Sequence, residues 1–203
     1  MSKLTQTAKR LDIFFRIIQI VTNIAWVGSL VCVGIAALGV CFQLDPNLVG
    51  TGYNSLELGF AELKIADAFA PDERMVLIQV GVVLALCAVF MLVAWKGCKE
   101  IRKILAPMIQ GEPFQGIVGK GLKKLAGYSI ALGIIGNVTI LAEQIFTTFI
   151  FDLSALLLSE KISHISFNYE IDLTFLVVAA VLLLTSYIFR YGEELQQLSD
   201  ETL

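Results

Sequence analysis

Four long apolar runs constrain this chain more than any other feature of its sequence. They cover residues 22–42, 75–95, 128–151 and 173–191. Each has close to the ~20 residues that an α-helix needs to cross ~30 Å of hydrocarbon. Only 16% of the residues are charged, against ~25% in a soluble domain, so lipid must solvate much of the surface. The runs therefore predict an all-α membrane protein, with residues 1–203 forming a single four-helix bundle.

The segments between the runs alternate in charge, which predicts the orientation. The N-terminal stretch up to residue 21 and the loop 96–127 are basic, whereas the loops 43–74 and 152–172 are acidic. Lys and Arg near the ends of spans stay on the cytoplasmic side. We therefore expect both termini and the loop 96–127 to be cytoplasmic. The net charge of −3 argues against direct binding of nucleic acid.

Helical periodicity extends beyond the first two runs. Apolar residues recur at helical spacing over residues 4–21, opposite a polar stripe, which predicts a helix lying in the inner membrane interface before the chain turns into the first span. A docking helix for a cytoplasmic partner is the alternative. The second run continues as a helix past Trp95, and we expect Pro107 to bend or end it.

The two outer loops show the alternation of β-strands. Leu56, Leu58 and Phe60 alternate with polar or small residues and, after a slip, so do Leu63 and Ile65, with Gly59 as a candidate β-bulge. The later loop alternates at Ile165, Phe167, Tyr169 and Ile171. This pattern predicts a small extracytoplasmic antiparallel β-sheet built from loops 43–74 and 152–172. A helix carrying Leu56, Phe60 and Leu63 on one face is the alternative for the first loop.

An ionisable residue, Glu143, interrupts the third apolar run. Such a group costs ~2.5 kcal/mol or more to insert unless it is paired or protonated, so it should face protein. Asn137, Gln144 and Thr148 extend a polar stripe on the same span. Three interpretations remain open: hydrogen bonds between helices, a site for a proton, ion or ligand, or a carboxylate shallow enough to reach the outer interface.

The remaining residues do not form a catalytic or metal-binding pattern. His164 is the only histidine, the four cysteines have no CxxC spacing, and no paired polar groups recur on several spans. We therefore expect no enzyme activity, no metal and no cofactor. Small residues such as Gly28, Gly34, Ser129, Gly133 and Gly136 are instead expected where helices approach closely in lipid.

Two short motifs carry a resemblance to a known family. They are the turn Gly111-Glu112-Pro113-Phe114, followed by a basic run into the third span, and the C-terminal segment from Ile188 to Leu203. With the four-span pattern, they make the chain similar to the YoaS-like bacterial four-pass membrane proteins. The resemblance implies an inner-membrane protein with no assigned activity, often encoded beside a small helix-turn-helix transcription factor.

These observations lead to three functional hypotheses. The first is a regulatory or signalling partner of a cytoplasmic helix-turn-helix protein, docked electrostatically on the acidic tail. The tail carboxylates are Glu193, Glu194, Asp200 and Glu201. The second is a transport, immunity or export accessory with a polar cavity at Glu143. The third is a structural subunit of a homo-oligomer. Membrane lipid is a partner in all three.

Overall fold

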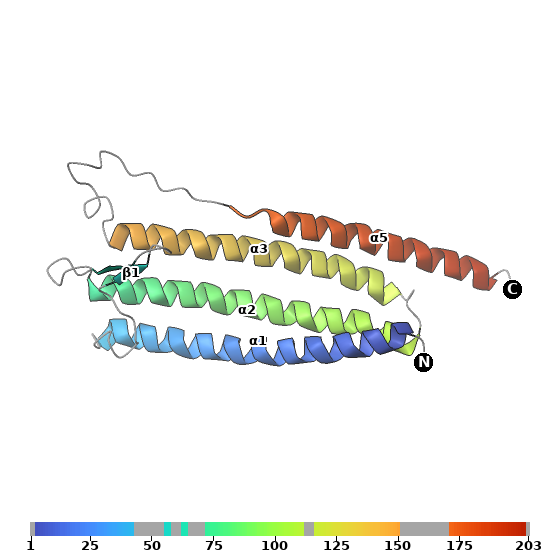
Figure 1. The fold of residues 1–203 in the computed structure, drawn as a ribbon, viewed down its shortest axis with the longest axis horizontal. Helices are drawn as coiled ribbons and strands as arrows, with labels where there is room; N and C mark the ends of the chain where they lie inside the picture. The colour runs from blue at the N-terminus through green and yellow to red at the C-terminus, as the bar shows by residue number, and fades with distance from the viewer. Residues whose placement is uncertain are drawn as a thin grey trace. The chain divides into compact units, whose positions relative to one another are not determined.

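Four long helices make up most of the computed structural model, which describes residues 3–42, 55–57, 62–64, 72–111, 116–150 and 171–201. In chain order the helices are α1 (Lys3–Phe42), α2 (Glu73–Gln110), α3 (Gly116–Ile150) and α5 (Thr174–Glu201), drawn from blue to red in Figure 1. All four are long and apolar enough to cross a membrane. The prediction of four membrane-length apolar helices is therefore confirmed.

The helix α1 is a single element, where the sequence predicted two. It runs without interruption for 40 residues, or about 60 Å, and appears as one continuous coil in Figure 1. The expected turn between an interfacial helix over residues 4–21 and a separate span is wrong. Neither glycine nor proline occurs between Lys3 and Val27, so nothing in this stretch breaks the helix.

One face of α1 exposes a continuous apolar stripe. Its members are three or four residues apart, except across Gly28, where the spacing is seven residues, or two helical turns, and this places them on one side of the helix. They are Leu11, Phe14, Ile17, Val21, Ile24, Val31, Ile35, Leu38 and Phe42, each at least 41% exposed. The stripe passes without a change of phase from the predicted amphipathic segment into the predicted span, which explains why the two form one helix.

The helices α2 and α5 also extend beyond the predicted spans. Pro107 lies inside α2 and does not end it. The end comes at Gly111, whose φ is +91° and whose N–H donates to the Met108 carbonyl at 3.4 Å. A left-handed residue after the last turn is a common helix stop, and glycine adopts it without strain. The predicted acidic tail is part of α5, which continues to Glu201.

The described β-structure is one short hairpin. The strands β1 (Ser55–Glu57) and β2 (Glu62–Lys64) pair antiparallel, with Leu56 opposite Leu63. Both belong to the first predicted outer loop, so a sheet shared by the two loops is not supported. The proposed bulge at Gly59 and residues 152–170 of the other loop lie outside the described residues.

The contacts divide the chain into two compact units, where the sequence predicted one domain. Unit 1 comprises Met1–Trp26, Val89–Asn137 and Ile171–Leu203, and unit 2 comprises Val27–Ala88 and Val138–Glu170. The helices α1, α2 and α3 each contribute a segment to both units.

Unit 1 contains a small core where α2, α3 and α5 meet. Ile104, Val118 and Leu122 are buried, and the Ser186 hydroxyl of α5 donates to the Gly119 carbonyl of α3 at 2.7 Å. The core is completed by the partly buried Met108, Leu125, Leu182 and Phe189. Apolar packing and a hydrogen bond to the backbone thus both join α3 to α5.

Unit 2 packs α1 against α2 through small residues. A Cβ at Gly81 would lie 3.7 Å from the Cβ of Ala36, and one at Gly39 would lie 3.4 Å from Leu77. Close approach of helices at small residues is the expected way to gain packing energy in lipid. Gly28 and Gly34, for which the same role was predicted, instead face open space in the part of α1 that the structure describes.

Candidate functional site

The amide of Asn137 joins α3 to the residue before α5. Its Nδ2 donates to the backbone oxygens of Gly133 (2.8 Å) and Asp172 (2.9 Å), and its Oδ1 accepts from the Asp172 N–H at 2.9 Å. The side chain therefore satisfies both backbone groups of Asp172. A hydrogen-bonding role between helices, the first of the three interpretations of the polar stripe, is what the structure supports for this residue.

Two further residues of α3 complete this contact, which we call the α3–α5 brace (Ser129, Gly133 and Asn137 against Asp172 and Phe175). The Ser129 hydroxyl donates to the Phe175 carbonyl at 3.4 Å. The Phe175 side chain lies directly over Gly133, where any Cβ would overlap it. The positions are spaced by four residues, so they form one face of α3.

The carboxylate of Asp172 caps the start of α5. Its Oδ1 accepts the Thr174 N–H at 2.8 Å. Hydrogen bonds from the Thr174 side chain and backbone lower the pKa of Asp172 below its ordinary value. The folded-state pKa is lowered, so the contribution of this cap to stability is present at neutral pH and is lost as the pH falls through that pKa.

Replacing Asn137 with leucine should weaken the brace measurably. The change leaves the N–H and carbonyl of Asp172 without their side-chain partner, and such contacts contribute about 0.6–1.7 kcal/mol each in membrane proteins. We expect a loss of about 2 kcal/mol in the free energy of unfolding, measured as thermal stability in mild detergent. Gln144→Leu, at an exposed position of the same helix, is the matched control, and equal losses in both variants would contradict the role assigned to Asn137.

The other members of the predicted polar stripe are not gathered into a buried site. Glu143 and Gln144 are exposed, and the Thr148 hydroxyl donates to the Gln144 backbone oxygen at 2.8 Å. Glu143 therefore does not pack against another described helix of this chain, and its predicted role stays a prediction. It lies about 10 Å of helix before the end of α3 at Ile150.

A polar contact that the sequence analysis missed lies in unit 2. The Gln79 side chain of α2 donates to the hydroxyl of Thr147 on α3 at 3.0 Å. The signal was present, because Gln79 is a polar residue inside an otherwise apolar run, and such residues usually bond to a neighbouring helix.

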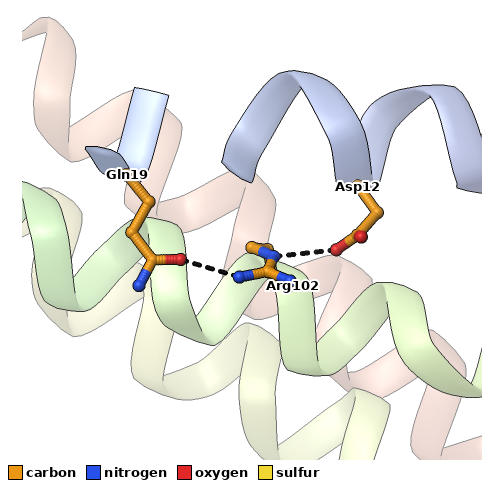
Figure 2. A network of polar contacts seen from close by, with 3 residues as sticks. All are labelled: Asp12, Gln19 and Arg102. Carbon is orange, nitrogen blue, oxygen red and sulfur yellow. Dashed lines mark hydrogen bonds and ion pairs between the residues drawn. The ribbon is translucent and has the colours of Figure 1, made fainter. Parts of the chain in front are cut away.

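The basic residue Arg102 of α2 holds two side chains of α1, as Figure 2 shows. Its Nε donates to Asp12 at 2.9 Å and its Nη1 donates to the Gln19 Oε1 at 3.0 Å. The side chains of Arg102 and Asp12 are only 28% and 24% exposed. This network, which we call the Arg102 network, fixes the N-terminal half of α1 along α2 within unit 1.

A second carboxylate of unit 1 is also surrounded by cations. Glu100 of α2 is 8% exposed and pairs with Lys103 at 2.9 Å and with Lys124 of α3 at 3.7 Å. Glu100 is one of two carboxylates, with Glu112, in the basic stretch 96–127. A carboxylate placed among cations was the signal for an ion pair between helices.

A groove of about 460 Å³ opens between α3 and α5 in unit 1. Its walls carry three cations, Lys120, Lys123 and Arg190, and one carboxylate, Glu193. The other lining residues are Gly116, Gly119, Leu183, Ser186 and Tyr187. Of the polar clusters in the described residues, this one combines space with uncompensated charge, and we take it as the candidate functional site, called the basic groove below.

The predicted docking carboxylates have different surroundings. Glu193 is half-buried and lies against Gly116, where a Cβ would come within 2.5 Å of its Oε1. Glu194 is exposed and pairs with Arg190 at 3.5 Å. Glu201 is exposed, and the side chain of Asp200 lies outside the described residues. The four positions therefore do not form one uniform acidic surface.

Comparisons with known proteins do not add a relationship to these observations. No protein-family model matches the chain, and no curated protein or solved structure is significantly similar to it.

Proposed function

We propose that this chain is a four-pass protein of the bacterial cytoplasmic membrane, with both termini in the cytoplasm. The four apolar helices and the charge alternation between them support the proposal. The ring of Trp95 lies near the predicted inner boundary, with the Lys99 ammonium 5.4 Å from its centroid. A ring and a cation stacked at this level suit the headgroup region.

Within that membrane, we infer a regulatory role as a platform for a small cytoplasmic helix-turn-helix protein. The observation that carries this proposal is the length of the helices. A ~30 Å crossing uses ~20 residues, yet α1 and α2 have 40 and 38. The excess in unit 1 is held together by the Arg102 network and by the Glu100–Lys124 pair, and we infer that it forms an ordered helical surface beyond the lipid.

The end of α5 supplies the charge that such a partner would need. Glu194 and Glu201 are exposed there, and the pair between Glu194 and Arg190 is exposed on both sides, so it contributes little and is easily exchanged. A DNA-binding protein presents a basic surface. Acidic side chains on the platform would attract it and would compete with DNA for the same surface.

Co-purification of the chain with a cytoplasmic helix-turn-helix protein tests this role. We expect the complex in low-salt extracts of native membranes. The triple variant Glu194→Gln/Asp200→Asn/Glu201→Gln should lower its affinity on the order of tenfold, at roughly 0.5 kcal/mol for each exposed charge. Glu143→Gln removes an exposed carboxylate of unit 2 and should leave the affinity unchanged. Failure to recover the complex, or equal losses in both variants, would refute the proposal.

The alternative of a transport or export accessory has less support. It requires the polar stripe of α3 to line a cavity, but Asn137 is occupied by the Asp172 backbone and Glu143 is exposed. The proposal of a cytoplasmic platform uses the described contacts, whereas the transport hypothesis needs them to be rearranged.

A further inference from the structure

We propose that the basic groove binds the phosphate of an anionic phospholipid from the membrane leaflet on the side of the two termini. The proposal rests on the membrane placement given above and is independent of the helix-turn-helix partner. It goes beyond that function because it assigns a ligand class to residues that no docking surface requires.

The first support is the charge of the groove. Lys120, Lys123 and Arg190 line it against one lining carboxylate, Glu193. With Glu194, which pairs with Arg190 from outside the lining, one positive charge remains in excess. Neither lysine forms an ion pair with any residue that the structure describes, in contrast to Lys124, which pairs with Glu100. Arg190 pairs with Glu194 at 3.5 Å, and their side chains are 72% and 58% exposed. An exposed pair of this kind is weak, so the guanidinium can exchange Glu194 for another anion. Its fork of N–H donors matches the oxygens of a phosphate.

The second support is the position of Glu193 at the start of α3. Its carboxylate lies against Gly116, the first residue of a 35-residue helix. The first turn of a helix carries N–H groups without helical partners and a partial positive charge, which favours an anion there. The chain thus already places one of its own anions in the groove, and a lipid phosphate would enter beside the same cations.

The third support distinguishes a lipid from free phosphate. Leu183 and Tyr187 line the groove on α5, and the apolar residues Leu184 and Ile188 of the same helix are exposed. Basic pockets between transmembrane helices at the cytoplasmic level are typical headgroup sites. An acyl chain would follow the apolar surface of α5 while the phosphate meets the cations.

Binding of short-chain phosphatidylglycerol to the purified full-length chain in neutral detergent, followed by native mass spectrometry, tests the proposal. Each cation near a membrane surface contributes about a fivefold factor in the affinity for an anionic lipid. Lys120→Gln/Lys123→Gln should therefore weaken binding on the order of 25-fold. The control Lys9→Gln/Lys96→Gln removes two exposed lysines outside the groove and should change it less than about twofold. Equal effects would show a diffuse surface attraction and overturn the site.

A gain of affinity provides an independent check. Glu193→Gln removes the competing carboxylate, and we expect binding to tighten about fivefold, with an unchanged thermal stability as evidence of folding. No tightening would contradict the assignment of Glu193 to the groove. Displacement of the lipid by inorganic phosphate alone, or equal binding of phosphatidylcholine, would refute an anionic-lipid site. The triple tail variant should bind lipid at least as tightly as the unchanged chain, because Glu194→Gln only frees Arg190 from its ion pair, so failure of the docking proposal and failure of this one are distinguishable.

Discussion

Replacing Gly133 with leucine is expected to destabilise the protein by about 3 kcal/mol, at the upper end of the range for overpacking a helix contact. Phe175 lies where any Cβ at this position would be placed. The Asn137 and Ser129 hydrogen bonds that flank the contact hold α5 close to α3, so the added side chain cannot be relieved without breaking them. Thermal unfolding in mild detergent, followed by size-exclusion chromatography, measures the loss.

Gly127 provides the matched control for this prediction. It lies on the same helix and is exposed, and a Cβ there would meet nothing within 4 Å. Gly127→Leu should therefore change the stability by no more than about 0.5 kcal/mol. In the double variant Gly133→Leu/Phe175→Ala, the removed ring makes space for the leucine, and part of the loss should be recovered. Equal losses at Gly127 and Gly133 would show that the brace does not determine the effect.

Replacing Arg102 with methionine should also be strongly destabilising, by about 2 kcal/mol. Methionine retains much of the packing but leaves Asp12 and Gln19 without their donor, and the Asp12 side chain is only 24% exposed. An uncompensated, partly buried carboxylate costs less than the 3–5 kcal/mol of a fully buried one, but more than a surface pair. The same unfolding assay measures this loss.

Two variants separate the Arg102 network from a general effect of charge. Arg190→Met breaks a pair that is exposed on both sides and should cost no more than about 0.5 kcal/mol in lipid-free detergent. Arg102→Met/Asp12→Leu removes both partners and should be more stable than the sum of the single losses predicts. A strictly additive double variant would contradict a direct interaction between Arg102 and Asp12.

The existence of the four helices and the continuation of α2 past Trp95 could be predicted from the sequence, but the uninterrupted course of α1 could not. Long apolar runs are unambiguous, because few other structures tolerate them. The predicted boundaries followed hydropathy, and hydropathy changes at Val21 and Tyr191 while the backbone has no reason to stop there. At Gly111, by contrast, a helix ends by a local signal that is visible in the sequence.

The candidate site was predictable in its parts and not in its assembly. Lys120 and Lys123 were recognised as basic residues before a span, but their joint placement with Arg190 depends on how α3 packs against α5. The surroundings of the carboxylates could not be predicted from the local sequence. Asp12 and Glu100 lie among cations in basic segments and form ion pairs between helices. Glu143 interrupts an apolar run and was expected to face protein, but its side chain is exposed in this chain.

The apolar stripe of α1 has a consequence for the bilayer itself. From Leu11 to Phe42 it extends about 46 Å along the helix, whereas a typical hydrocarbon layer is only ~30 Å deep. The N-terminal part of the stripe therefore continues past the hydrocarbon, along the segment that the Arg102 network holds against α2. Exposed apolar side chains at that level would draw acyl chains up around the helix, so the bilayer should be locally thicker next to α1.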